Sequence, residues 1–318
     1  MKTLHQVSGK RRKGAALALT TAIFWGVLPV VIRVLVDKVD VLTIVWYRLL
    51  GAAVILSFFI IRRYGLTPVF RFRGSALPLT AVTVLGLAGN YVTYALGIKY
   101  LSPSMAVVMI QVAPMMLLLG GLVIFKERFR PSQWFGLILL LSGQVLFFNR
   151  RLGAMLSGIN NFSIGAAVMV LSALVWAAYA LCQKQLLRYF PSEIVIFRIY
   201  LGGAILLLPL ARPGLILNLD PLRVGLLIFC AIDTVIAYGC FSEALDHLEA
   251  SRVSLVVAVT PLVTLGTAAA GAALFPGYLR PEEVGLLGLV GAVLVVAGSM
   301  TASFFQVPSS AKVSRDQD

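Results

Sequence analysis

Ten long apolar segments dominate this sequence and constrain its fold more than any single residue does. They cover approximately residues 14–36, 41–61, 76–98, 103–125, 132–149, 163–187, 193–211, 222–246, 250–275 and 282–305. A helix needs about 20 apolar residues to cross a bilayer, and the segments lack the alternating pattern of strands in a membrane β-barrel. The sequence therefore predicts an all-α integral membrane protein with ten transmembrane helices.

The composition and the charge distribution agree with this class. The chain is 59% apolar and only 13% charged, whereas soluble domains are about 45–50% apolar and about 25% charged. Its formal charge of +14 could suggest a nucleic-acid partner. However, most lysines and arginines fall in alternate connections and in the tails, as the positive-inside rule predicts when both termini are cytoplasmic. We therefore expect the lipid bilayer as a partner and no nucleic acid.

Matched residues indicate an internal repeat. Positions in the first half recur 147 to 151 residues later in the second half; the pairs are Trp25/Trp176, Arg48/Arg198, Tyr91/Tyr238 and Pro114/Pro261. Each half holds five predicted spans, and because five is odd, the second copy is inverted in the membrane. Inverted repeats are typical of secondary transporters. The predicted organisation is a basic tail (1–13), a first repeat (14–149), a linker (150–162), a second repeat (163–305) and a polar tail (306–318).

Asp233 is the sharpest candidate for chemistry, because it lies about halfway along the eighth predicted span. An ionisable side chain at the centre of a membrane helix costs about 2.5–3.5 kcal/mol on insertion scales, so such residues often have a functional role. A carboxyl group at this depth could bind and release a proton and so couple transport to a proton gradient. It could equally be a hydrogen-bonded residue that holds two helices together, and the sequence leaves both interpretations open.

Arg48 and Arg198 form a matched pair about one and a half turns inside the second and seventh spans. Either guanidinium could bind a substrate carboxylate through two hydrogen bonds. Alternatively, each could extend to the membrane interface by snorkelling. Arg33 is followed four residues later by Asp37, so it is more simply explained by an ion pair within one helix.

Polar and aromatic residues form stripes at helical spacing that we expect to face a central cavity. We place this cavity mainly between the first, third, sixth and eighth spans, because Asn and Gln avoid the lipid. With the two arginines, the predicted substrate-binding residues are Trp25, Arg48, Asn90, Tyr94, Gln111, Trp176, Tyr179, Gln183 and Arg198.

Motifs for other chemistries are missing from the sequence. It has no phosphate-binding loop and no metal-ligand or catalytic motif, and Cys182, Cys230 and Cys240 all lie inside predicted spans. We therefore expect no metal and no enzymatic activity.

Two blocks of sequence, 95–143 and 243–263, carry a family resemblance. The first contains "FKERF" followed by "QWFG", and the second contains "EALDHLEASRVSLVVAVTPLV". With these motifs the chain resembles the drug/metabolite transporter superfamily, in particular its EamA-type ten-helix members. Where the first half has Lys126-Glu127-Arg128, the second has Pro276-Gly277-Tyr278, so a symmetric role for Glu127 is not expected.

The resemblance implies a multi-pass carrier of the bacterial inner membrane, with both termini cytoplasmic, that moves small metabolites and often exports amino acids. It implies no cofactor and is compatible with a monomer or a homodimer. A lipid flippase of the same fold is the main alternative to a small-molecule transporter. An integral membrane enzyme is a more distant alternative, because no catalytic constellation supports it.

Overall fold

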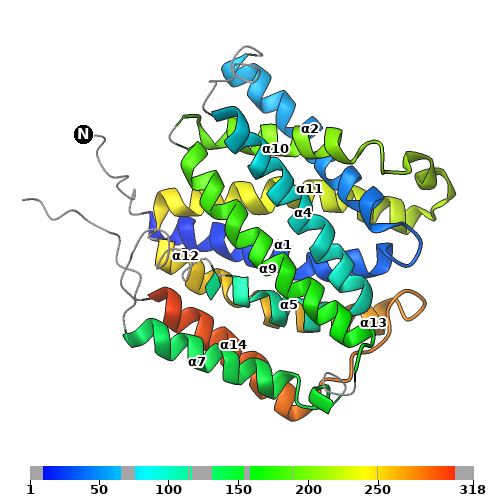
Figure 1. The fold of residues 1–318 in the computed structure, drawn as a ribbon, viewed down its shortest axis with the longest axis vertical. Coiled ribbons are helices and arrows are strands. Elements are labelled where there is room, and N and C mark those ends of the chain that lie inside the picture. The colour runs from blue at the N-terminus through cyan, green and yellow to red at the C-terminus, as the bar shows by residue number, and fades with distance from the viewer. Residues whose placement is uncertain are drawn as a thin grey trace, which may run out of the picture.

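A computed structural model describes residues 10–65, 76–113, 115–116, 131–153, 158–187, 189–248 and 250–304. Within these ranges every regular element is helical (Figure 1). The elements are α1 (Arg11–Leu35), α2 (Val41–Tyr64), α4 (Leu77–Tyr100), α5 (Pro103–Ile110), α7 (Pro131–Phe147), α9 (Asn161–Leu186), α10 (Ser192–Leu207), the 3-10 helix η2 (Pro213–Asn218), α11 (Pro221–His247), α12 (Ala250–Val257), α13 (Thr260–Leu274) and α14 (Leu286–Phe304).

The helices confirm the predicted class. In the described part of the chain, six segments are long and apolar enough to cross a membrane; they lie in α1, α2, α4, α9, α11 and the stretch Leu255–Leu274. Two shorter apolar helices cover Pro131–Phe147 and Leu286–Thr301. The count of ten spans stays a prediction, because residues 117–130, including Glu127, lie outside the described residues.

The ninth predicted span is two helices rather than one. α12 ends at Val257, and α13 begins at Thr260 with Pro261 in its first turn. Proline is tolerated in the first turn of a helix, where its missing amide hydrogen would have no partner. Pro261, which lies inside one continuous predicted span, therefore marks a break between two helices. Its match, Pro114, lies outside the described residues.

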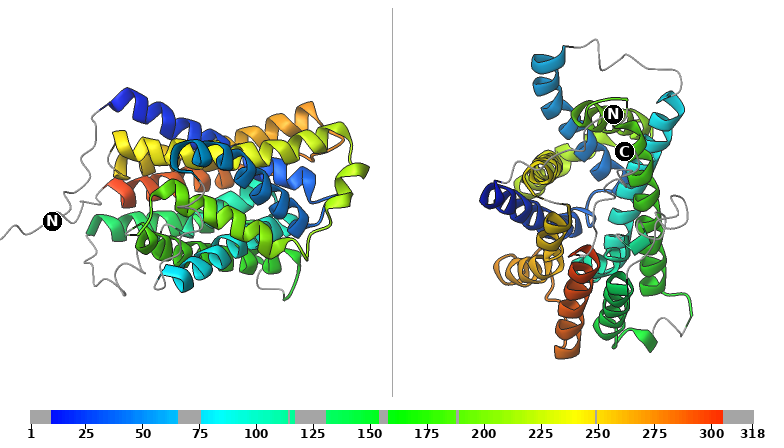
Figure 2. Two further views of the ribbon diagram at one scale, coloured as in Figure 1. Left: turned by 90° about the horizontal axis from the view of Figure 1, so that it is seen from above. Right: turned by 90° about the vertical axis from the view of Figure 1, so that its left-hand side faces the viewer.

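The helices pack in pairs along roughly one direction (Figure 2). The most extensive contacts join α7 to α14, α4 to α9, α1 to α11 and α2 to α10. Helix α11 also packs on α2, and α4 packs on α10. The start of α1 and the end of α14 lie at the same end of the bundle (Figure 1). We call this end of the bundle, where α2 also finishes and α10 starts, the α1 end.

Four helices that start at the end of the bundle opposite the α1 end have side-chain N-caps. Asp40, Ser102, Asn160 and Asp220 accept backbone hydrogen bonds at the starts of α2, α5, α9 and α11. Such caps satisfy amide groups that have no partner inside the helix. The Asp220 carboxylate also binds Arg223, which lowers the pKa of Asp220. These caps fix the helix ends opposite the α1 end.

Candidate functional site

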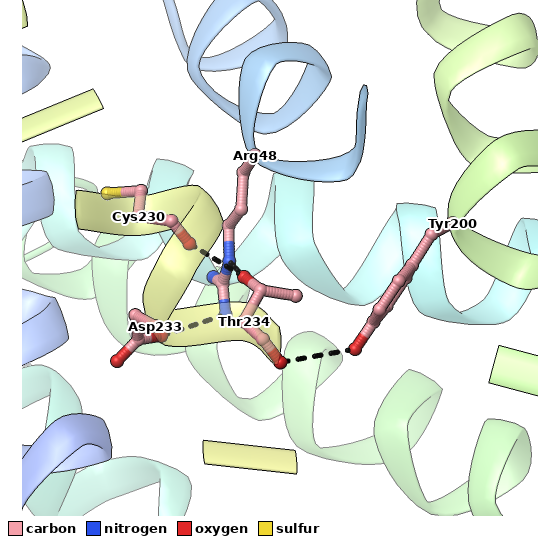
Figure 3. A network of polar contacts seen from close by, with 5 residues as sticks. All are labelled: Arg48, Tyr200, Cys230, Asp233 and Thr234. Atoms are coloured by element: carbon pink, nitrogen blue, oxygen red, sulfur yellow. Dashed lines mark hydrogen bonds and ion pairs between the residues drawn. The ribbon is translucent and has the colours of Figure 1, made fainter. Parts of the chain in front are cut away.

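A buried ion pair between α2 and α11 is the centre of the candidate site (Figure 3). Nη2 of Arg48 lies 3.8 Å from Oδ2 of Asp233, and the two side chains are only 5% and 0% exposed. Nε of Arg48 also donates a hydrogen bond of 2.6 Å to Oγ1 of Thr234. The structure thus brings together two of the side chains that the sequence singled out.

Two further helices contribute to this network. The Arg48 guanidinium lies 4.0 Å from the ring centroid of Tyr91 on α4, a cation–π contact. From α10, the hydroxyl of Tyr200 donates to the carbonyl oxygen of Thr234 at 3.5 Å (Figure 3). The Thr234 hydroxyl in turn donates to the carbonyl oxygen of Cys230 at 2.8 Å. One arginine therefore links α2, α4 and α11, and α10 joins them through Thr234.

The Asp233 carboxylate has binding capacity that the protein leaves unused. Among the described residues, neither of its oxygens accepts a hydrogen bond, and its distance of 3.8 Å to Arg48 is long for a charge-assisted hydrogen bond. A buried charge with so few partners is costly. This carboxylate is therefore suited to bind a proton or the ammonium group of a ligand.

Arg198 occupies a different environment from its match, Arg48. Its side chain is also buried, and its guanidinium lies 4.0 Å from the ring centroid of Phe190, which precedes α10. At an offset of 147 residues, the positions that match Asp233 and Thr234 are Gly86 and Leu87, which offer no carboxylate or hydroxyl. The ion pair therefore joins the two halves of the chain, and the sequence does not repeat it at the matched positions.

The other predicted site residues lie on several helices. Trp25 packs against the rings of Tyr238 and Phe241, with centroid distances of 5.3 and 5.5 Å. Tyr179 is 4% exposed and packs closely against Gly86. A Cβ added at Gly86 would lie 3.1 Å from the Cβ of Tyr179. The remaining part-buried residues are Tyr94, Gln111, Trp176 and Gln183. No contact in the structure tests their predicted role in substrate binding.

Asn90 joins α4 to α9. Its amide donates to both the carbonyl and the hydroxyl oxygen of Ser172, each at 2.9 Å, and the Ser172 hydroxyl donates back to the carbonyl oxygen of Asn90 at 3.3 Å. Since Asn90 is only 6% exposed, these bonds hold the helix pair together inside the bundle. Its predicted contact with substrate stays a prediction.

The first testable prediction concerns the hydrogen bonds between Asn90 and Ser172. We expect Asn90→Ala to lower the stability by about 0.6–1.7 kcal/mol, the range measured for hydrogen bonds between membrane helices, and to leave the half-saturation concentration for substrate unchanged. Thr93→Ala is the control, because the Thr93 hydroxyl bonds only to carbonyl groups of its own helix. Melting temperatures in detergent and transport kinetics test both variants. A raised half-saturation concentration without destabilisation would instead support direct substrate contact.

A cavity of about 320 Å³ lies between α2, α10 and α11. Its lining residues are Leu56, Arg63, Ser192, Glu193, Ile196, Tyr200, Thr234, Val235, Tyr238, Gly239, Ser242 and Glu243. Of the first, third, sixth and eighth spans, between which the sequence predicts a central cavity, only the eighth lines this one. The predicted central cavity stays a prediction. Helix α1 packs directly against α11 and α4 against α9, and Trp25 on α1 packs against two aromatic rings of α11.

Sequence reasoning missed Tyr200, Thr234 and Ser242. Thr234 directly follows Asp233, and Tyr200 lies two residues after Arg198, so proximity to the singled-out charges was the available signal. Among the described residues, no group of three or more His, Cys, Asp or Glu side chains is placed to hold a metal ion.

Comparisons with known proteins identify the family. The model of the family described as "EamA-like transporter family" matches residues 12–149 and 163–304. The chain is 36% identical over 288 residues to the "Uncharacterized inner membrane transporter YhbE" of Escherichia coli (strain K12), covering 90% of each chain. It is 25% identical over 320 residues to the "Probable amino-acid metabolite efflux pump" of Salmonella typhimurium (strain LT2), covering 95% of this chain and 99% of that one.

A solved structure has the same fold, with a TM-score of 0.62 and 16% identity, over 92% of this chain and 97% of that one. The family match covers most of the chain in two segments, and the Escherichia coli relative is more than one-third identical across nine-tenths of it. The chain therefore belongs to the EamA-like transporter family and is a membrane transporter.

Proposed function

We propose that this transporter exports small, amino-acid-like metabolites across the bacterial inner membrane by alternating access, and that Asp233 couples export to the proton gradient. The observation that carries this proposal is the buried Arg48–Asp233 pair, in which the carboxylate has no hydrogen bond among the described residues. The names of the relatives as an inner membrane transporter and an amino-acid metabolite efflux pump support the location, the substrate class and the direction.

The pair offers complementary charges to a zwitterion. Arg48 uses Nε for Thr234, and its Nη2 lies 3.8 Å from Oδ2 of Asp233. The terminal amino groups could bind a substrate carboxylate. The ammonium group of the same substrate can then bind Asp233. A zwitterion would thus replace one weak internal ion pair by two charge-assisted contacts.

A proton and a substrate ammonium group would compete for Asp233. The titratable groups near it come from three helices: Arg48 on α2, Tyr91 and Tyr94 on α4, and Cys230 and Tyr238 on α11. Because the substrate ammonium group and the proton would bind the same carboxylate, binding of one would release the other, which allows exchange of substrate for proton.

Alternating access would come from two inverted halves, residues 14–149 and 163–305, that move against each other. Under the repeat, the contact of α4 with α9 corresponds to that of α1 with α11, and both are extensive. Two hydrogen bonds match in the same way. The Ser172 hydroxyl donates to the carbonyl oxygen of Asn90, and the Thr21 hydroxyl donates to that of Ala237. Thr21 is the match of Ser172 at an offset of 151 residues, and Ala237 is the match of Asn90 at an offset of 147. These matches support the inverted repeat.

The proposed orientation places the α1 end of the bundle in the cytoplasm. Arg11, Arg12 and Lys13 lie at the start of α1, and Arg62 and Arg63 lie near the end of α2, so both helices carry positive charge at this end. Positive charge favours the cytoplasmic side. Both termini would then be cytoplasmic.

Reconstitution tests the proposed transport. Purified protein in liposomes is given a panel of labelled amino acids and related metabolites, with and without a pH gradient, and a fluorescent lipid serves as the probe for the flippase alternative. We expect movement of at least one amino-acid-like solute and no movement of lipid. If no solute moves under any gradient, or if only the lipid moves, the proposal is wrong.

The second prediction concerns proton coupling. We expect Asp233→Asn to keep the fold, since the amide has nearly the same shape, and to abolish the stimulation of export by a pH gradient, since the amide does not titrate. Asp37→Asn is the matched control, because Asp37 is a half-exposed carboxylate that pairs with Arg33 at 3.4 Å within one helix turn. Flux with and without a gradient tests both variants. An Asp233→Asn protein that still responds to the gradient would exclude Asp233 as the coupling group.

A further inference from the structure

We infer that Thr234 is a positioning residue, whose hydroxyl holds the Arg48 guanidinium in the orientation that binds a substrate carboxylate. This inference rests on the proposed function, because it concerns the specificity of the same site. It goes beyond that proposal by naming the side chain that makes this site prefer solutes with a carboxylate over solutes that carry an amine alone.

The contact between Thr234 and Arg48 is the shortest polar contact of the network in Figure 3. Nε of Arg48 lies 2.6 Å from Oγ1 of Thr234, and the two residues are only 4% and 0% exposed. Among the described residues, Thr234 is the only hydrogen-bond partner of the Arg48 side chain. The direction of the guanidinium therefore depends on this one hydroxyl more than on any other polar group.

The hydroxyl of Thr234 is itself held in one direction. A hydroxyl has one hydrogen to donate and two lone pairs that accept. The hydrogen of Thr234 goes to the carbonyl oxygen of Cys230, one turn earlier in α11, at 2.8 Å. The lone pairs are then left for Arg48, so Thr234 can act only as an acceptor towards Nε. A rigid turn of α11 thus sets where the guanidinium of α2 is bound.

These contacts leave one edge of the guanidinium for a ligand. A guanidinium binds a carboxylate through two parallel hydrogen bonds, either from Nε with one terminal nitrogen or from the two terminal nitrogens. Thr234 occupies Nε, and Cζ of Arg48 lies 4.0 Å from the ring centroid of Tyr91. Tyr91 thus restrains the guanidinium from α4 and Thr234 restrains it from α11. The edge formed by Nη1 and Nη2 remains for a substrate carboxylate.

The matched arginine of the second half lacks this device. Under the repeat, the contact of α10 with α4 corresponds to that of α2 with α11. The position on α4 that matches Thr234 is Leu87, whose side chain has no group that forms hydrogen bonds. A hydroxyl positions only one of the two arginines in this way, so we assign carboxylate recognition to Arg48.

Ligand binding to purified protein tests the positioning role. The ligands are a mixture of the common amino acids and a mixture of the corresponding amino acid amides, which keep the amine but lack the carboxylate. A ligand that binds the folded protein raises its melting temperature. The concentration that gives half of the maximal shift therefore measures the affinity for each mixture, and the ratio of the two concentrations measures the preference for a carboxylate.

We expect the wild-type protein to prefer the amino acids. Thr234→Val keeps the shape of the side chain and should lower the affinity for amino acids about tenfold, as loss of one hydrogen bond to a charged group would, and that for amides less than about twofold. Thr234→Ala should lose the preference as well, whereas Thr234→Ser keeps the hydroxyl and should retain it. Thr83→Val is the matched control and should behave as the wild type, because Thr83 is also fully buried and its hydroxyl donates to the carbonyl oxygen of Leu79 in its own helix.

Three results would overturn the positioning role alone: an unchanged preference in Thr234→Val, an equal loss of affinity for both mixtures, or the same loss in Thr234→Ser. Equal affinity of the wild-type protein for both mixtures would instead remove the carboxylate contact from the proposed function, and the inference with it. If the wild-type protein binds neither mixture, the proposed substrate class is itself wrong.

Discussion

Arg48→Met is expected to destabilise the protein by about 3 kcal/mol and to abolish transport. The substitution leaves Asp233 fully buried without its cationic neighbour, and breaking a buried ion pair by removing one partner costs about 3–5 kcal/mol. The lower end applies because Asp233 can take up a proton and so avoid an isolated charge. Melting temperature in detergent, followed by tryptophan fluorescence, and flux in liposomes measure the two effects.

A double variant separates structure from function at this pair. Arg48→Met with Asp233→Asn removes both charges, and replacement of a whole buried pair by groups of similar volume is often neutral in stability. We expect it to recover most of the lost stability but no transport. Arg33→Met, which removes an exposed ion-pair partner, is the control and should cost no more than about 1 kcal/mol. Normal transport by the double variant would show that the pair only holds helices together.

Gly291→Ala is expected to destabilise the protein by about 1–3 kcal/mol, the usual cost of overpacking. A Cβ at Gly291 would lie 2.4 Å from the backbone nitrogen of Phe147 and 2.6 Å from the carbonyl oxygen of Gly143. Both are backbone atoms of α7 that move only if the helices separate. Gly298 makes the same kind of contact, 2.4 Å from the backbone nitrogen of Leu140. Small residues allow membrane helices to approach this closely.

Gly266→Ala is the matched control, because a Cβ there meets no atom within 4 Å. Glycine costs about 1 kcal/mol relative to alanine inside a helix, so this variant should be as stable as the parent or more stable. The opposite signs of the two substitutions isolate the contact between α7 and α14. Equal melting temperatures for both variants would contradict the close packing of these helices.

The class of fold could be predicted from the sequence because it depends on local composition. A run of about 20 apolar residues specifies a membrane helix without reference to the rest of the chain. The break between α12 and α13 could not be predicted from the sequence, because one proline fits a kink within a helix or the start of a new one.

The candidate site could be predicted only in part. The depth of Asp233 in an apolar segment marked it as unusual, but nothing local connects it with Arg48, which is 185 residues earlier in the sequence. Their contact depends on how α2 packs against α11. For the same reason, the matched arginines appeared equivalent, although Arg48 pairs with Asp233 and the guanidinium of Arg198 lies over the ring of Phe190.

The central claim is that substrate and proton compete for the Arg48–Asp233 pair, and proton release on substrate binding tests it most directly. Purified transporter in weakly buffered detergent solution receives the amino acid found in the liposome panel, while a pH-sensitive dye records protons in the medium. We predict that substrate acidifies the medium with the wild-type protein and that Asp233→Asn, added at the same concentration, gives no signal. Substrate binding without proton release by the wild-type protein at any pH, or equal release by Asp233→Asn, would contradict the claim.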